Sequence, residues 1–180
     1  MTREQILPRL IGGLFVVLVI LTGSPAAFAQ ASNTDARAVT IGPLSVVKTQ
    51  DLRYGNIISG TGNGTVTVDT RNGNVSTTGD ATLAGGETGP ANFIIYGGPN
   101  QIVEISIPGS LMVTHTNGTD QMRVDQLAIG NGNRNFSTFV RGLLGTLGIY
   151  NLTVGGRLRV NGNQQTGAYR GSFIMTVDYQ

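Results

Sequence analysis

The stretch GSFIMTVDYQ, residues 171–180, decides the fold, because it has the pattern of a half-buried β-strand. Apolar side chains occupy every second position: Phe173, Met175, Val177 and Tyr179. Successive side chains of a strand point to opposite faces, so these four are expected to face one core. The sequence stops at Gln180, and we expect this strand to keep a free edge.

The rest of the chain repeats this pattern of short alternating runs between turn residues. Gly accounts for 27 of the 180 residues and Lys48 is the one lysine, so no charged amphipathic helix is evident. Asn72-Gly73 and Asn117-Gly118 are pairs favoured in tight hairpins, and SGTGNG, residues 59–64, is predicted to be another turn. About eight to ten short strands, spaced by roughly 8–12 residues, predict an all-β fold, either a β-sandwich or a barrel. Of the two we expect an immunoglobulin-like β-sandwich.

The first 29 residues are predicted to be a secretory signal peptide. Arg3 and Arg9 precede an apolar run of 14 residues, 10–23, and Ala27-Phe28-Ala29 has the small-x-small pattern of a cleavage site. A transmembrane anchor needs about 20 apolar residues, which this run lacks. We therefore expect an exported chain with no transmembrane segment after cleavage. Residues 30–44 are then an N-terminal extension or donor strand, and residues 45–180 are the sandwich domain.

Charge and composition argue against several classes of partner. Without residues 1–29 the chain has ten basic and nine acidic residues, and they are scattered along the sequence. We expect no basic face and hence no nucleic-acid partner. The chain has no Cys, so its sheets and core, or association with other chains, must hold it together without disulfides.

The sequence contains few side chains that could catalyse a reaction. We expect that the protein is not an enzyme and binds no metal or cofactor. His115 is the one histidine, whereas serine triads need a histidine base and zinc sites favour several His and Cys ligands. No D-x-D-x-D-G calcium loop occurs. Glu104 and Asp125 would resemble a glycosidase pair if they met across strands, but a sandwich with nine carboxylates allows many such pairs.

The end of the chain resembles the C-terminal signature of chaperone–usher pilins, the fimbrial subunits of Gram-negative bacteria. Gly167 is fourteenth from the C-terminus, Tyr179 is penultimate, and an alternating strand lies between them. The segments TQDLRYG (49–55), PANFIIYG (90–97) and TGAYRGSFIMTVDYQ (166–180) are also similar to a family of exported bacterial proteins of unknown function.

The pilin resemblance implies a sandwich that lacks its last strand and carries a groove beside its C-terminal strand. The resemblance further implies that a periplasmic chaperone fills such a groove first, and that the N-terminal arm of the next subunit then replaces the chaperone by β-augmentation at an outer-membrane usher. In this chain the resemblance implies a subunit-binding groove at Gly167, Phe173, Met175, Val177 and Tyr179, and a donor arm that contains Val39 and Ile41.

Two functions follow as expectations. The first is a structural subunit of a fimbria or similar adhesive surface polymer, bound to identical or related subunits and located in the periplasm and then at the cell surface. The alternative is a self-complete secreted sandwich that binds glycan or matrix. The segment from Val39 to Val47 equally fits an ordinary first strand, and Gly167 equally fits a turn that needs a positive φ.

Overall fold

The computed structural model describes residues 40–130 and 137–180, which form strands and connecting turns without any helix. The predicted all-β class is therefore confirmed. The predicted signal peptide (residues 1–29), most of the predicted extension and the arm residue Val39 lie outside the described residues. In the part of the chain that the structure describes, no helix has the length and apolar character to cross a membrane.

The strands are numbered along the chain. They are β1 (Ser45–Gln50), β2 (Arg53–Tyr54), β3 (Ile57–Val68), β4 (Val75–Leu83), β5 (Thr88–Gly89), β6 (Ala91–Tyr96), β7 (Ile102–Ser106), β8 (Leu111–His115), β9 (Gln121–Gly130), β10 (Phe139–Leu143), β11 (Ile149–Val160), β12 (Tyr169–Arg170) and β13 (Thr176–Tyr179).

Strand β11 is the centre of the main sheet, in which all pairings are antiparallel. The strand order is β1-β6-β11-β9-β8-β12, and the β3–β4 hairpin also joins β11. Residues 149–154 of β11 pair with β6, residues 156–160 pair with β3, and β9 runs along the other edge. The predicted alternation is confirmed by the buried side chains of Leu152, Val154, Leu158 and Val160.

A smaller sheet, in the order β10-β7-β13, shares its hydrophobic core with the main sheet. Val103 and Ile105 of β7 belong to the same buried cluster as Ile95 of β6 and Ile129 of β9, and all four are at most 1% exposed. Two sheets around one core make the β-sandwich that the strand spacing predicts. The immunoglobulin-like topology stays a prediction.

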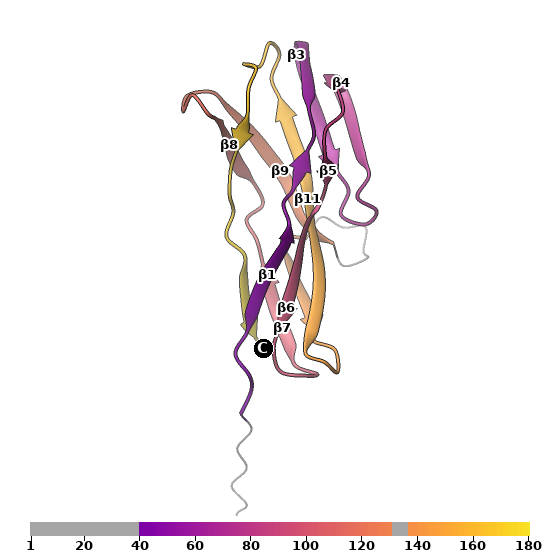
Figure 1. The fold of residues 1–180 in the computed structure, drawn as a ribbon, viewed down its shortest axis with the longest axis vertical. Coiled ribbons are helices and arrows are strands. Elements are labelled where there is room, and N and C mark those ends of the chain that lie inside the picture. Colours follow the sequence, from indigo (N-terminus) through magenta and orange to yellow (C-terminus); the bar gives the residue numbers. More distant parts are fainter. Residues whose placement is uncertain (1–39, 131–136) are drawn as a thin grey trace, which may run out of the picture. The chain divides into compact units, whose positions relative to one another are not determined.

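Two segments, residues 102–115 and residues 169–179, pass from one sheet to the other and pair with each other at both ends. β7 belongs to the smaller sheet and continues into β8 of the main sheet, while β12 of the main sheet continues into β13 of the smaller one. β13 pairs with β7, and β12 pairs with β8. We call residues 169–179 the terminal segment. Figure 1 shows it in yellow, ending at the C-terminus beside the start of β1.

The terminal segment lies at the edge of both sheets. β12 is the last strand of the main sheet after β8, and β13 is the last strand of the smaller sheet after β7. Among the described strands, each therefore has a hydrogen-bonded neighbour on one side only. The expectation that the C-terminal strand has a free edge agrees with this strand order.

The two predicted hairpins are confirmed, but the predicted turn at residues 59–64 is wrong. Gly73 and Gly118 have φ values of +70° and +81° at the β3–β4 and β8–β9 turns. Residues 59–64 instead lie inside β3, where the pairing with β4 shifts register between Ser59 and Gly64. The Asp80 carboxylate accepts a hydrogen bond from the Gly62 N–H at 2.7 Å, so these glycines form an irregular part of a strand.

Candidate functional site

A cleft of about 1190 Å³ opens between residues 51–59 and residues 164–173. We call it the terminal cleft, because one wall contains the first half of the terminal segment. Its lining includes Phe93, Val124 and Leu158, which belong to the hydrophobic core. The cleft therefore gives access to the interior of the sandwich.

The cleft forms where the terminal segment changes sheets. Between the pairs Thr114–Arg170 and Ser106–Thr176, the seven residues 107–113 face only the five residues 171–175. This mismatch interrupts the ladder, so residues 171–175 are not part of a strand. The C-terminal strand, predicted as continuous, is therefore two short strands, β12 and β13. The five residues between them, 171–175, have no strand pairing, and we call them the unladdered centre.

The predicted groove residues point toward the core but do not all reach the cleft. Phe173, Met175, Val177 and Tyr179 are partly buried against the core, and the residues between them are exposed. Gly167 and Phe173 line the cleft, whereas the other three lie farther along the segment and do not. The Phe173 ring packs edge-on against Phe93, with centroids 6.2 Å apart.

Residue 167 must be a glycine for two reasons. Its backbone lies close to the side chain of His115, and its φ is one that other residues rarely adopt. Its φ is +147°, and a Cβ at this position would lie 1.9 Å from Nε2 of His115. The His115 ring is fixed at this place: Nδ1 accepts a hydrogen bond from the Asn117 N–H at 2.9 Å, and Nε2 lies 3.1 Å from the Thr166 carbonyl oxygen. Because Nδ1 accepts, Nε2 carries the proton and donates to Thr166.

Tyr179 joins the end of the terminal segment to the beginning of the described chain. Its hydroxyl donates to the Gly42 carbonyl and accepts from the Gly98 N–H, both at 2.6 Å. The arm residue Ile41 lies against Gly98, where a Cβ would come within 2.7 Å of it, and stays 45% exposed. The chain from Ile41 onward therefore contacts its own domain.

Tyr54 of β2 is a residue of the cleft that the sequence reasoning missed. It lines the cleft, and its hydroxyl is the one buried side-chain polar atom without a hydrogen-bond partner among the described residues. Burial, and secondarily the charge of Asp125, raises the pKa of Tyr54 well above its usual value. The segment TQDLRYG contains this tyrosine, but its sequence pattern does not predict that the hydroxyl is buried.

The Tyr54→Phe variant is expected to be more stable than the wild type by about 1 kcal/mol, because it removes an unpaired buried polar group. Urea unfolding of the purified domain measures the difference. Tyr169→Phe is the matched control, since the Tyr169 hydroxyl donates to Gln165 at 2.7 Å and accepts from Gln164 at 2.8 Å. This control should lose stability, and a loss in Tyr54→Phe as well would contradict the assignment of an unpaired hydroxyl.

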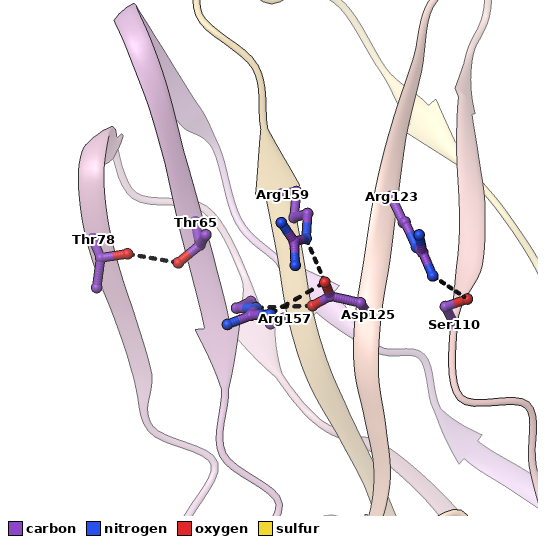
Figure 2. Close-up of polar contacts among 7 residues, drawn as sticks. All are labelled: Thr65, Thr78, Ser110, Arg123, Asp125, Arg157 and Arg159. Carbon is purple, nitrogen blue, oxygen red and sulfur yellow. Dashed lines mark hydrogen bonds and ion pairs between the residues drawn. The ribbon is translucent and has the colours of Figure 1, made fainter.

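Three arginines gather on the outer face of the main sheet, which corrects the expectation that the chain has no basic face. We call Arg123, Asp125, Arg157 and Arg159 the arginine face (Figure 2). The Asp125 carboxylate accepts from Nε and Nη2 of Arg157 at 2.8 and 3.2 Å, and from Nε of Arg159. Asp125 is only 8% exposed.

The carboxylate pair considered from the sequence does not meet. Glu104 on β7 accepts from Nε of Arg141 at 3.0 Å, while Asp125 binds the two arginines of β11. Among the residues that the structure describes, no three His, Cys, Asp or Glu side chains are placed to hold a metal ion.

The arginine pair gives stability a definite dependence on pH. Hydrogen bonding to Arg157, and then to Arg159, outweighs burial and lowers the pKa of Asp125 below its ordinary value of 3.8. A lowered pKa stabilises the fold above the unfolded value and loses that contribution as pH falls through the folded value. We expect wild type and Asp125→Asn to differ most above pH 4 and to converge at lower pH in urea unfolding. A constant difference between pH 7 and 2 would contradict this.

The sequence of the sandwich domain matches a known protein family. A family model described as a domain of unknown function, DUF4402, matches residues 44–179. The chain belongs to the DUF4402 family. No curated protein and no solved structure matches it.

The DUF4402 match spans the strands that the structure describes. It begins at Leu44, one residue before β1, and ends at Tyr179, the last residue of β13. The terminal cleft, the arginine face and the Tyr179 contact to Gly98 therefore all lie within the DUF4402 domain. The similarity to a family of unknown function that the sequence suggested is confirmed at this level.

Proposed function

We propose that this chain is a structural subunit of a fimbria or similar surface polymer, in which an extended segment of a neighbouring copy inserts beside the terminal segment. One observation carries the proposal. The terminal cleft opens onto core side chains beside a strand that, within residues 40–130 and 137–180, is hydrogen-bonded on one side only. An unpaired strand edge next to apolar side chains is the arrangement to which another chain adds by β-augmentation.

The state of the terminal segment supports an unfinished sandwich. Residues 171–175 lack ladder pairing, and Phe173, Met175 and Val177 are only partly buried, although they face the core. A strand laid in the cleft would pair with the unladdered centre and cover Phe173. Each apolar side chain that it buries contributes about 1.5–3 kcal/mol before ordering costs.

The proposed occupant is the segment before Thr40 of a second copy, which contains Val39. The described chain starts beside the C-terminal end of the terminal segment, because Tyr179 bonds Gly42. The cleft lies along residues 164–173, toward the other end of the same segment. The donor segment would therefore extend from one end of the domain, and the acceptor cleft lies toward the other end. Contacts of this kind join subunits head to tail, and they build a filament unless the subunits close into a ring.

Export fits this role. The predicted signal peptide would bring the chain to the periplasm, where a chaperone would cover the same edge until an outer-membrane usher replaces it with the next subunit's arm. Each step uses main-chain pairing along the terminal segment.

Deletion of residues 31–39 tests the proposal, because it leaves Ile41 and Gly42 in their contacts with the domain. The mature chain, residues 30–180, should form ladders of oligomers in unheated SDS gels. The deletion variant should stay monomeric, and the midpoint of its urea unfolding should be unchanged. A variant in which Gly and Ser replace residues 31–39 keeps the length and should also stay monomeric. Stable monomers of the intact mature chain, or equal ladders from all three proteins, would overturn the proposal.

A further inference from the structure

The arginine face has a feature that costs stability within the domain. Arg123 of β9 and Arg159 of β11 are direct partners across the strand pair. Like charges directly opposite each other in an antiparallel pair destabilise a sheet. Asp125 compensates diagonally, since it binds Arg159 as well as Arg157. One carboxylate thus binds two of the three guanidinium groups.

The single carboxylate of the arginine face balances one of its three positive charges. Asp125 is held by Arg157 and Arg159, and Arg123 donates to the Ser110 hydroxyl at 3.3 Å, a neutral partner (Figure 2). The Arg159 side chain is 56% exposed. The face carries a net charge of +2, although the chain after residue 29 has ten basic and nine acidic residues overall.

Residues with hydroxyl groups are the cross-strand partners of two of the arginines, and together they form rows across the sheet. Arg159 is paired with Thr65, which in turn is paired with Thr78. The two threonine hydroxyls bond each other at 2.7 Å, as Figure 2 shows. In the adjoining row, Arg157 is paired with Thr67 and then Ser76. Paired residues of an antiparallel sheet lie on the same face, so guanidinium and hydroxyl groups form one polar surface across four neighbouring strands.

We propose that the arginine face binds an acidic polysaccharide, one that carries carboxylate or sulfate groups. The planar guanidinium group matches such anions with two parallel hydrogen bonds. The neighbouring hydroxyls of Thr65, Thr67 and Thr78 can donate to and accept from sugar hydroxyls. These rows contain no aromatic side chain, whereas proteins that bind single-stranded nucleic acids stack bases on aromatic rings.

This binding does not depend on polymer formation. Val124 and Leu158 line the terminal cleft, and their neighbours Arg123 and Arg159 point to the opposite face of the same strands. An inserted strand and a polysaccharide would therefore occupy opposite sides of the main sheet at the same time.

The test compares two arginine pairs. The double variant Arg123→Gln, Arg159→Gln removes two charges from the face. The control Arg71→Gln, Arg141→Gln removes two charges from arginines that bind Asp69 and Glu104 elsewhere. Wild type, variant and control are titrated with dextran sulfate, polygalacturonate, neutral dextran and a single-stranded DNA oligonucleotide, and circular dichroism checks that each is folded.

We expect wild type to bind dextran sulfate, polygalacturonate or both, and not neutral dextran, with an affinity that falls as salt is added. The face variant should lose about tenfold or more in affinity, and the control should stay within about twofold of wild type, since its arginines are already paired with carboxylates. The two polyanions separate sulfate from carboxylate recognition. The proposal is overturned if wild type binds neither polyanion, if the control loses as much as the face variant, or if DNA binds more tightly than both polysaccharides.

Discussion

The Gly167→Ala variant should unfold with a free energy about 3 kcal/mol below that of wild type. The added Cβ would lie 1.9 Å from Nε2 of His115, and the φ of +147° is one that alanine rarely adopts. Backbone strain and overpacking each cost about 1–3 kcal/mol. The histidine cannot simply turn away, because both of its ring nitrogens are hydrogen-bonded.

Urea unfolding measures this loss, and two comparisons isolate its cause. Gly118→Ala changes a glycine with a φ of +81° where no atom of the described residues lies within 4 Å of the added Cβ, so it should cost only about 1 kcal/mol. In a His115→Ala background the steric part of the Gly167→Ala penalty should disappear, which a double-mutant cycle detects. A Gly167→Ala protein as stable as wild type would refute the close contact.

The Tyr179→Phe variant should lose about 2 kcal/mol of stability, since it leaves the N–H of the buried Gly98 without a partner. The hydroxyl now accepts from this N–H and donates to the carbonyl of the exposed Gly42, at 2.6 Å each. The loss should appear as a lower urea midpoint, with faster amide exchange at Gly98.

Tyr96→Phe is the control for Tyr179→Phe, because the Tyr96 side chain is 40% exposed. It should unfold within about 0.5 kcal/mol of wild type. If Tyr179→Phe behaves like this control, the tyrosine hydroxyl does not tie the start of the described chain to its end.

Local patterns were sufficient to predict much of the fold. The alternation of Phe173, Met175, Val177 and Tyr179 depends only on neighbouring residues, and the structure places all four toward the core. The Asn-Gly hairpins are equally local. Glycines were ambiguous, because residues 59–64 carry turn residues yet belong to β3, whose pairing with β4 shifts register between Ser59 and Gly64.

The features that depend on strand partners were not predictable from the sequence. The break at residues 171–175 arises because a longer stretch of the neighbouring strand faces it, around Pro108. The arginine face requires knowing that Arg123 and Arg159 are partners across β9 and β11. Scattered charges in the sequence therefore gave the wrong expectation of a surface without a basic face.

Amide hydrogen exchange at residues 171–175 tests directly whether a neighbouring copy inserts a strand. It compares the assembled mature chain with the variant that lacks residues 31–39. If a neighbouring copy inserts a strand in the terminal cleft, exchange at these amides should slow by about tenfold or more in the assembled protein. Assembled protein in which residues 171–175 exchange as fast as in the deletion variant would contradict strand insertion.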